Sequence, residues 1–300
     1  MDILTSWSVA IFAHNEARTI TGCLDSVVSQ DSGSCGRIYV LVNGSQDATE
    51  RIVSEYTITH SNVTLVRLQL ADKASAWNHY VHKICSEEDF HFFVDGDTTV
   101  APNSFRALAK ALRSAPGADA AGALPVSGRD RVGWSQRMIA FGRLAGCLYA
   151  MRGRFVSELR NRAIRMPAGL IGEDLFLSCL VKNLLSRSGL MQPSPRLVFA
   201  AEAGFAFDSL ALNRPRDWIV YGRRLVRYRI RDYQLAMLLR HLETHPQLVV
   251  PPNVETLYQQ TSELPDYYWR GRITPFDLLA VWQIRRVARK HAIASTSPSE

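Results

Sequence analysis

Two acidic residues one position apart, Asp95 and Asp97, follow a short apolar run in the segment FHFFVDGDTT (90–99). Like charges at that spacing repel, and a cation bound between or beside them relieves the repulsion. Carboxylate oxygens on a tight turn suit a hard ion such as Mg²⁺ or Mn²⁺. The pattern therefore predicts a divalent metal that bridges the protein to a substrate diphosphate, which the carboxylates alone would repel.

Two other uses of an Asp-x-Asp turn make different demands. An EF-hand loop beginning at Asp95 needs glycine at its sixth position and glutamate at its twelfth, where this chain has Val100 and Arg106, so that use is excluded. A haloacid-dehalogenase-type phosphatase begins with a strand and DxDxT, which VDGDTT resembles, with Asp95 as nucleophile and Asp97 as general acid. That fold has its DxD strand near the start of the chain, whereas about ninety residues come first here. The phosphatase is kept as the alternative function.

Polar residues gather in four other short segments. These are FAHNEA (12–17), VNGSQDAT (42–49), ADKASAWN (71–78) and IGED (171–174). In a functional interpretation Lys73 reaches a phosphate, and one acid of the Glu173–Asp174 pair is a general base. A structural explanation is open for each segment, because Asn15 and Asp47 suit helix caps and acids are favoured in a helix's first turn.

The elements that must position these residues alternate along the first part of the chain. Apolar runs at 7–13, 37–42, 62–68 and 90–94 read as strands, and helical patterns follow at 16–30, 48–56, 73–85 and 102–113. Such alternation predicts an α/β fold with a mostly parallel central sheet flanked by helices, which is Rossmann-like. Ligands of such sheets bind beyond the carboxyl ends of the strands, where the Asp-x-Asp turn would lie.

The second part of the chain is less regular. We expect an apolar helix over 132–151, a turn and a helix over 170–185, and one more strand over 196–203. From 210 onward the pattern is mainly helical.

Composition limits the class of protein. The 300 residues are 47% hydrophobic with a formal net charge of +7, which fits a globular protein with anionic partners. Five cysteines, with no CxxC pair, argue against a zinc site and a disulfide scaffold and for a reducing compartment. Neither a signal peptide nor a run of about 18 apolar residues is evident, so we expect a cytoplasmic location.

The order of the five motifs is more specific than any one of them. Strand–xxxNE, strand–NGSxDxT, KAxAxN, strand–VDGDT and GED before a helix together resemble the inverting nucleotide-sugar glycosyltransferases of family 2, which have the GT-A fold. LAGCLYAMRGRF (144–155) also resembles the family's segment before its base motif. The resemblance covers roughly residues 7–205.

The resemblance implies a nucleotide-sugar donor held at the strand ends. Phe12, His14 and Glu16 match positions that hold the base and ribose, although the family often has Pro or Thr at the first and Tyr at the second. Asn43 stands where an acid often reads the base, and it can still hydrogen-bond an amide edge. Lys73 matches a basic position near the donor.

The resemblance also implies the metal and the base. Asp95 and Asp97 match the metal motif for Mg²⁺ or Mn²⁺, with Asp97 the direct ligand, and Asp174 matches the catalytic base. Glu173 would orient Asp174 or bind the acceptor. The enzyme would move one sugar to a saccharide, lipid-linked or small-molecule acceptor with inversion. A nucleotide-binding protein of the same fold without activity is a further alternative, which the presence of all three aspartates disfavours.

We expect a GT-A domain over 1–205, with nucleotide-sugar binding in 1–100 and the acceptor and base region in 101–205. Residues 206–300 would form a helical region packed on the same domain. The QxxRW motif of processive members is not met near Trp218, so single-sugar transfer is expected.

Two C-terminal segments combine apolar and basic residues. In 214–231 one helical stripe carries arginines and the opposite stripe aromatic and apolar residues; the stripes are Arg216, Arg223, Arg227 and Arg231 against Trp218, Tyr221, Leu225 and Tyr228. The basic stripe would face a diphosphate, a lipid phosphate or an anionic membrane, or simply solvent. The segment 276–291 packs on the domain or contacts a membrane, so a peripheral location is open. Nucleic acid is not expected, because the aromatic and basic residues do not interleave on a sheet face.

Overall fold

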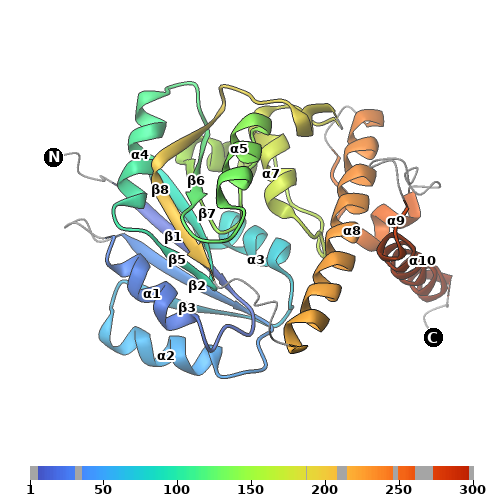
Figure 1. Cartoon of the computed structure of the whole chain (residues 1–300), viewed down its shortest axis with the longest axis horizontal. Helices are drawn as coiled ribbons and strands as arrows, with labels where there is room; N and C mark the ends of the chain where they lie inside the picture. Colours follow the sequence, from blue (N-terminus) through green and yellow to red (C-terminus); the bar gives the residue numbers. More distant parts are fainter. Residues whose placement is uncertain are drawn as a thin grey trace.

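The computed structural model describes residues 6–30, 36–186, 188–207, 215–245, 249–260 and 273–296, with the side chains of 215–220 and 290–296 left aside. In this part of the chain one mixed sheet forms the centre of the molecule (Figure 1). Its strands are β1 (Trp7–Ala13), β2 (Arg37–Asn43), β3 (Val63–Leu68), β4 (Phe90–Asp95), β5 (Thr98–Val100), β6 (Ala120–Pro125), β7 (Leu148–Arg152) and β8 (Leu197–Phe207). Their spatial order is β3-β2-β1-β4-β7-β6-β8-β5.

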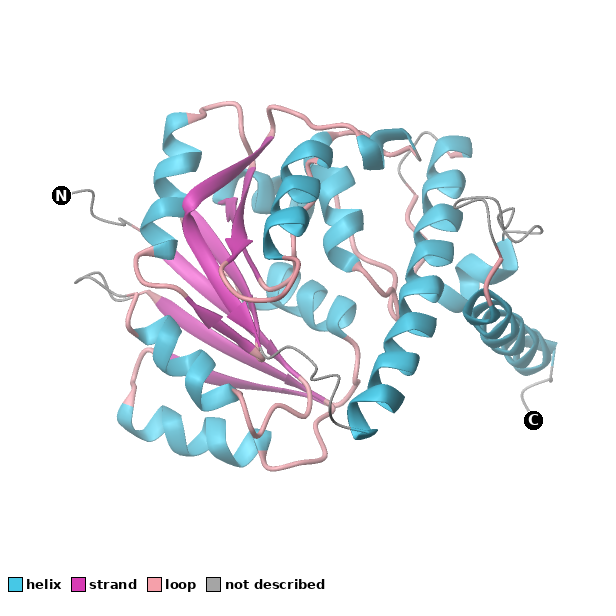
Figure 2. Cartoon of the chain, viewed as in Figure 1, coloured by secondary structure: helices cyan, strands magenta, loops and turns pink. Residues whose placement is uncertain are grey.

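The described helices lie against this sheet and beyond it. They are α1 (Ile20–Val28), α2 (Thr49–Thr59), α3 (Lys73–His79), the π-helical turn η1 (Tyr80–Ile84), α4 (Ser104–Ser114), α5 (Arg131–Phe141), α6 (Gly153–Asn161), α7 (Glu173–Lys182), the 3-10 turn η2 (Ser188–Met191), α8 (Pro215–Thr244), α9 (Val254–Gln260) and α10 (Pro275–Thr296). Figure 2 shows the helices on both faces of the strands, with α8 and α10 at one end of the molecule.

The first four strands are those that the alternation predicts. β1 pairs in parallel with β2 and with β4, and β2 pairs in parallel with β3. The remaining strands make the sheet mixed, because β7 runs antiparallel to both β4 and β6, and β5 runs antiparallel to β8. The parallel half therefore follows the prediction, and the other half extends it.

The helix expected over 132–151 is wrong in its second half. α5 ends at Phe141, and Gly142 follows with a φ of 57°, a left-handed conformation that ends helices. Residues Leu148–Arg152 then form β7 in the middle of the sheet, with four of the five buried. A strand buried on both faces has no alternating pattern, so its apolar run looks like that of a buried helix.

Alternation along β1 divides the interior into two cores. Val9 and Ile11 face the side covered by α1 and α4, while Ala10 and Phe12 face the side covered by α3 and α7. The second core continues into the C-terminal helices. Its members there include Leu238 on α8, Leu257 on α9, and Ala280, Val281 and Ile284 on α10. The C-terminal helices thus share a core with α7, the helix that carries the predicted base.

Candidate active site

The Asp-x-Asp turn is attached directly to the end of β1. Phe12 and Asp95 are paired across β1 and β4, and the Gly96 N–H donates to the Phe12 carbonyl at 2.8 Å. A Cβ at Gly96 would lie 3.0 Å from the Ala13 Cβ and 3.0 Å from the Phe12 carbonyl oxygen, so the close approach of the two strand ends favours glycine. The carboxyl ends of β1 and β4 therefore meet at one edge, as predicted for a parallel sheet.

Lys73 joins the first aspartate of this turn to the predicted base motif. Its Nζ, at the start of α3, forms an ion pair with Asp95 and a second ion pair with the Glu173 Oε1 at 2.6 Å. The side chains of Lys73 and Asp95 are 24% and 26% exposed, so the pair reaches the surface of the site. The Phe12 ring packs beneath, with its centroid 5.8 Å from the Lys73 Nζ. Three of the five motifs thus converge on one ammonium group.

Gly146, which the sequence reasoning did not single out, fits between these charged groups. A Cβ at this position would lie 2.7 Å from the Lys73 Nζ and 3.2 Å from the Asp95 Oδ2. Its N–H donates to the Asp174 Oδ2 at 3.1 Å. The only sequence signal was its place in the segment 144–155. Gly146 therefore brings Asp174 to the same cluster as Lys73 and Asp95.

The two acids of the base motif have opposite electrostatic character. Burial opposes ionisation of Glu173, but the charge and hydrogen bond of Lys73 outweigh it and lower the pKa of Glu173. Burial and the negative charge of Glu173 raise the pKa of Asp174. Such a separation of two neighbouring carboxyls is what acid–base chemistry requires, since one stays charged while the other exchanges a proton. Of the two carboxyl groups, Asp174 therefore has its pKa raised and Glu173 has its pKa lowered.

Burial is also the largest influence on the pKa of Asp95. It raises the pKa of Asp95 to about 6, Lys73 opposes the change, and the charges of Asp97 and Glu173 add to it. The pKa of Glu16 is raised by burial and, after the opposing hydrogen bond from Thr19, by the charges of Asp97 and Asp95. This edge of the sheet is therefore rich in negative charge, and a cation would stabilise it.

The side chains at this edge supply some of the oxygen ligands that a hard divalent ion needs. Asp97 is exposed and offers oxygen atoms beside Asp95. Among the described residues, however, no three His, Cys, Asp or Glu side chains gather closely enough to hold a metal alone. An ion here would need further oxygen ligands from a substrate or water.

His14 and Asn43 lie on the adjoining β1–β2 edge. The His14 Nδ1 is 2.7 Å from the Asn43 carbonyl oxygen, and the His14 ring is exposed. The Asn43 side chain is buried, and its Oδ1 has no hydrogen-bond partner in the part of the chain described here. A buried acceptor without a donor costs about 1–3 kcal/mol, so this atom suits a ligand N–H.

Asn15 does not cap α1 as the sequence suggested. It adopts a left-handed φ of 58°, and its Oδ1 accepts from the Gln46 N–H at 2.8 Å, while α1 begins only at Ile20. Asp47 does serve the start of α2, where its Oδ1 accepts from the Thr49 N–H at 3.0 Å, and its Oδ2 accepts from the Ala17 N–H. Both side chains therefore tie the β1 and β2 loops together.

A cavity of about 540 Å³ opens beside this cluster. Its lining comes from the segment before α3, the loop before α7, and the helices α8 and α9; it includes Asp72, Lys73, Ile171, Glu173, Arg227 and Asn253. The volume is in the range of small-molecule sites. The predicted base motif therefore faces a site that the C-terminal helices complete.

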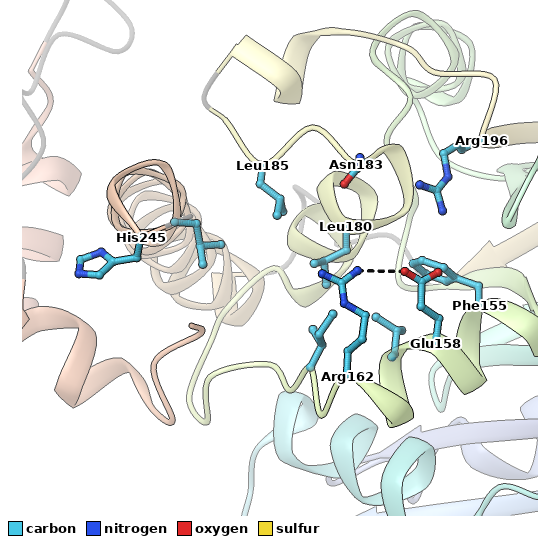
Figure 3. Close-up of a pocket in the computed structure, with 11 residues that line it drawn as sticks. Phe155, Glu158, Arg162, Leu180, Asn183, Leu185, Arg196 and His245 are labelled. Atoms are coloured by element: carbon cyan, nitrogen blue, oxygen red, sulfur yellow. Dashed lines mark hydrogen bonds and ion pairs between the residues drawn. The ribbon is translucent and has the colours of Figure 1, made fainter. Parts of the chain in front are cut away.

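A smaller cavity, of about 170 Å³, lies elsewhere between α6, α7 and α8 (Figure 3). Phe155 and Leu180 form its apolar wall, and Arg162, paired with Glu158 at 3.0 Å, lies on its polar side. None of the predicted site residues lines it. The larger cavity, by contrast, is lined by Lys73 and Glu173.

The loop before α7 is fixed by residues that the sequence reasoning missed. The Gln234 Oε1, on α8, accepts from the Ile171 N–H at 2.8 Å, and its Nε2 donates to the Tyr258 hydroxyl at 2.7 Å. Ala168 exchanges main-chain hydrogen bonds with Pro252 and Val254, each at 2.9 Å. No local pattern could have revealed these contacts, because they join segments far apart in the sequence.

Solved structures with a similar fold include nucleotide-sugar enzymes. The mannosyltransferase PcManGT from Pyrobaculum calidifontis, solved with GDP-Man and Mn²⁺, matches with a TM-score of 0.56 over 98% of this chain and 76% of that one, at 19% identity. S. aureus TarS 1–349, solved with UDP-GlcNAc, matches at 0.53 over 97% and 92%, at 17% identity. Glucosyl-3-phosphoglycerate synthase from Mycobacterium tuberculosis matches at 0.51 over 82% and 80%, at 21% identity. The fold is that of the GT-A-type glycosyltransferases.

The sequence itself identifies the family. The model of glycosyl transferase family 2 matches residues 8–168, more than half of the chain. No curated protein matches the sequence. The chain belongs to glycosyl transferase family 2 and is a nucleotide-sugar glycosyltransferase. The predicted family, fold and enzyme class are confirmed, and the phosphatase alternative is set aside.

Proposed function

We propose that this enzyme moves one sugar from a nucleoside diphosphate sugar to an acceptor hydroxyl with inversion, and that Asp174 is the general base. The observation that carries the proposal is the placement of Asp95, Lys73, Glu173 and Asp174 around Gly146 beside the larger cavity. A departing diphosphate and an attacking hydroxyl meet at one carbon, so the groups that serve them have to lie together.

The donor's base and ribose would lie against the ends of β1 and β2. Asn43 supports this, since a base N–H would satisfy its buried, unpaired Oδ1. His14 is oriented by the Asn43 carbonyl and presents its exposed ring to the same edge, near Glu16. Phe12 is only 5% exposed, so its part is to pack beneath Lys73 rather than to stack on a base.

A divalent cation, Mg²⁺ or Mn²⁺, would be held by Asp97 with Asp95, and when bound it would offset the charge that grows on the leaving diphosphate. The exposed Asp97 carboxylate and the excess of acids at this edge support the assignment. The Mn²⁺ in the structures of PcManGT and of glucosyl-3-phosphoglycerate synthase supports it as well.

Asp174 would take the proton of the acceptor hydroxyl as that oxygen attacks the anomeric carbon. The new C–O bond forms on the face opposite the bond to the diphosphate, and one displacement gives inversion. The Gly146 N–H holds one oxygen of Asp174, while Glu173 stays charged beside Lys73 and raises the pKa of Asp174.

A screen of nucleotide sugars by Mn²⁺-dependent thermal stabilisation would identify the donor, and variants would then test the roles. Asp174→Asn should keep donor binding and lose transfer by about 10²-fold or more. Asp97→Ala should lose metal-dependent donor binding. Glu158→Gln, at an exposed ion pair on α6, is the matched control and should transfer normally. Transfer by Asp174→Asn at the unmutated rate would refute the base assignment.

We also propose peripheral contact with an anionic membrane through α10. No helix in the described ranges is long and apolar enough to cross a bilayer. The outer face of α10 instead carries exposed apolar residues followed by arginines; these are Leu278 (58% exposed), Leu279 (48%) and Trp282 (55%), then Arg285, Arg286 and Arg289. Aromatic and leucine side chains beside arginines suit the boundary of anionic headgroups.

Co-sedimentation with vesicles tests this contact. The protein should bind vesicles that contain phosphatidylglycerol more than vesicles of phosphatidylcholine, and added salt should weaken the binding. A triple change of Leu278, Leu279 and Trp282 to serine should abolish it. Ile58→Ser, which changes an 83%-exposed apolar residue on α2, should have no effect. Equal binding to both kinds of vesicle would contradict the proposal.

A further inference from the structure

The larger cavity is lined by Lys73 and Glu173 and also by residues outside the proposed catalytic cluster. Residues 70–73 and Glu173, where the proposed reaction takes place, contribute to its lining, and so do Arg227 on α8 and Asn253 and Glu255 at the start of α9. A donor occupying the strand ends would leave the part of the cavity at Arg227, Asn253 and Glu255 open. It is therefore the part of the site in which a second substrate fits.

This part of the cavity is preformed. The loop 168–171 is held to α8 and α9 by the hydrogen bonds of Gln234 and by the main-chain bonds of Ala168. Gly169 and Gly172 both have a φ of 80°, and a Cβ on them would collide with Val254 and Arg231 respectively. Such close packing fixes the distance between the base motif and the C-terminal helices.

The two positively charged side chains that line the cavity differ in whether they are already paired with a carboxylate. Its two cations are Lys73 and Arg227, and Lys73 is already paired with two carboxylates. Arg227 is exposed and has no hydrogen bond or ion pair with any residue in the described ranges. Its positive charge reaches the site: burial raises the pKa of Glu173, and the charge of Arg227 adds to the larger effect of Lys73 that lowers it.

The acidic residues that line the cavity limit which ligands can bind to Arg227. Asp72 is engaged as the cap of α3, accepting from the Ser75 N–H at 2.9 Å, and Glu173 is paired with Lys73. Glu255 also lines the cavity. A ligand with several negative charges would be repelled, whereas one anionic group can pair with Arg227 while hydroxyl groups donate to the acids.

We propose that this cavity binds the acceptor, and that the acceptor is a hydroxyl compound with a single phosphate or carboxylate group that pairs with the guanidinium of Arg227. The inference rests on the proposed function, because it assumes that the acceptor hydroxyl is activated at Asp174. Arg227 is the specificity-determining residue of this pairing, and it takes no part in the proton transfer.

Matched pairs of compounds test the inference on the full chain saturated with Mn²⁺ and the nucleoside diphosphate that stabilises it. Glycerol 3-phosphate against glycerol and glucose 6-phosphate against glucose represent free acceptors. Dihexanoyl phosphatidylglycerol against dihexanoylglycerol represents a lipid headgroup. Binding is measured by calorimetry. We expect one anionic member to bind at least about tenfold more tightly than its neutral partner, a typical effect of a hydrogen bond to a charged group.

Two arginine variants then locate the pairing. Arg227→Gln should remove that preference and leave nucleoside diphosphate binding within about twofold. Arg223→Gln, at an exposed arginine one turn earlier on α8 that does not line the cavity, should change neither. The inference is overturned if no anionic compound is preferred, if Arg227→Gln keeps the preference, or if Arg227→Gln weakens only the nucleotide. Failure of any nucleotide to bind would instead count against the proposed function.

Discussion

The Lys73 Nζ lies 2.6 Å from the Glu173 Oε1 and also pairs with Asp95, so one ammonium group links the predicted metal motif to the predicted base motif. Burial raises the pKa of both carboxyls, and the charge of Lys73 acts against that effect at each of them. The predicted contact of this lysine with a phosphate stays a prediction, and the structure shows it paired with both carboxylates.

Lys73→Met should therefore lower the free energy of unfolding by roughly 3 kcal/mol, the lower end of the range for removing one partner of a buried pair. Urea denaturation monitored by tryptophan fluorescence measures the change. Arg51→Met removes an exposed pair with Glu55 and should cost less than about 1 kcal/mol. Equal losses of unfolding free energy in the two variants would show that the pairs of Lys73 contribute no more than the exposed pair of Arg51.

The transfer rate should rise with pH through the raised pKa of Asp174. A general base acts when deprotonated, so burial and the charge of Glu173, which raise this pKa, place the acid limb of the kcat profile above the ordinary range of aspartate. Glu173→Gln removes the neighbouring negative charge and should move that limb to lower pH. The profile is measured at saturating substrates; a limb that stays in place in Glu173→Gln would exclude the coupling.

His91 should make stability depend on pH. Its Nδ1 is buried against the Tyr80 hydroxyl at 2.9 Å and against Ser8, and burial lowers the pKa of His91 from 6.5 to about 4. Between these values the unfolded chain binds more protons than the folded chain, so stability is lost as the pH falls through this window. We expect a loss of about 2 kcal/mol from this residue between pH 7 and pH 5.

Urea denaturation at both pH values, compared with His91→Gln, checks this contribution. The variant should lose that part of the pH dependence, even if its stability at pH 7 is lower. His245→Gln, at an exposed histidine, should keep the full dependence. An unchanged pH dependence in His91→Gln would show that other groups are responsible.

Gln234 should position the base motif without touching substrates. Gln234→Leu leaves the Ile171 N–H without its acceptor, which costs about 1–3 kcal/mol. We expect kcat to fall while the dissociation constant of the nucleotide stays within about twofold. Gln234→Glu keeps an acceptor oxygen for Ile171 and should restore most of kcat, which a merely destabilised protein would not show.

Much of the donor side was predictable from local patterns. Strands β1, β2 and β4 are predictable because each is an apolar run in the sequence. The polar residues that follow them lie close together, because parallel strands end at a common edge of the sheet. The order of the motifs then identified the family. β7 was missed because a central strand buried on both faces shows no alternation.

The sequence by itself thus determined the class of fold, the family and the residues that carry charge at the strand ends, since each depends on short-range pattern and motif order. Only the tertiary structure decided which charges pair. The contacts of Lys73 with Glu173, of Gly146 with Asp174 and of Gln234 with Ile171 join segments that are distant in the chain. Such partners depend on how helices pack across the sheet, and helix packing is a property of the whole core that no local pattern encodes.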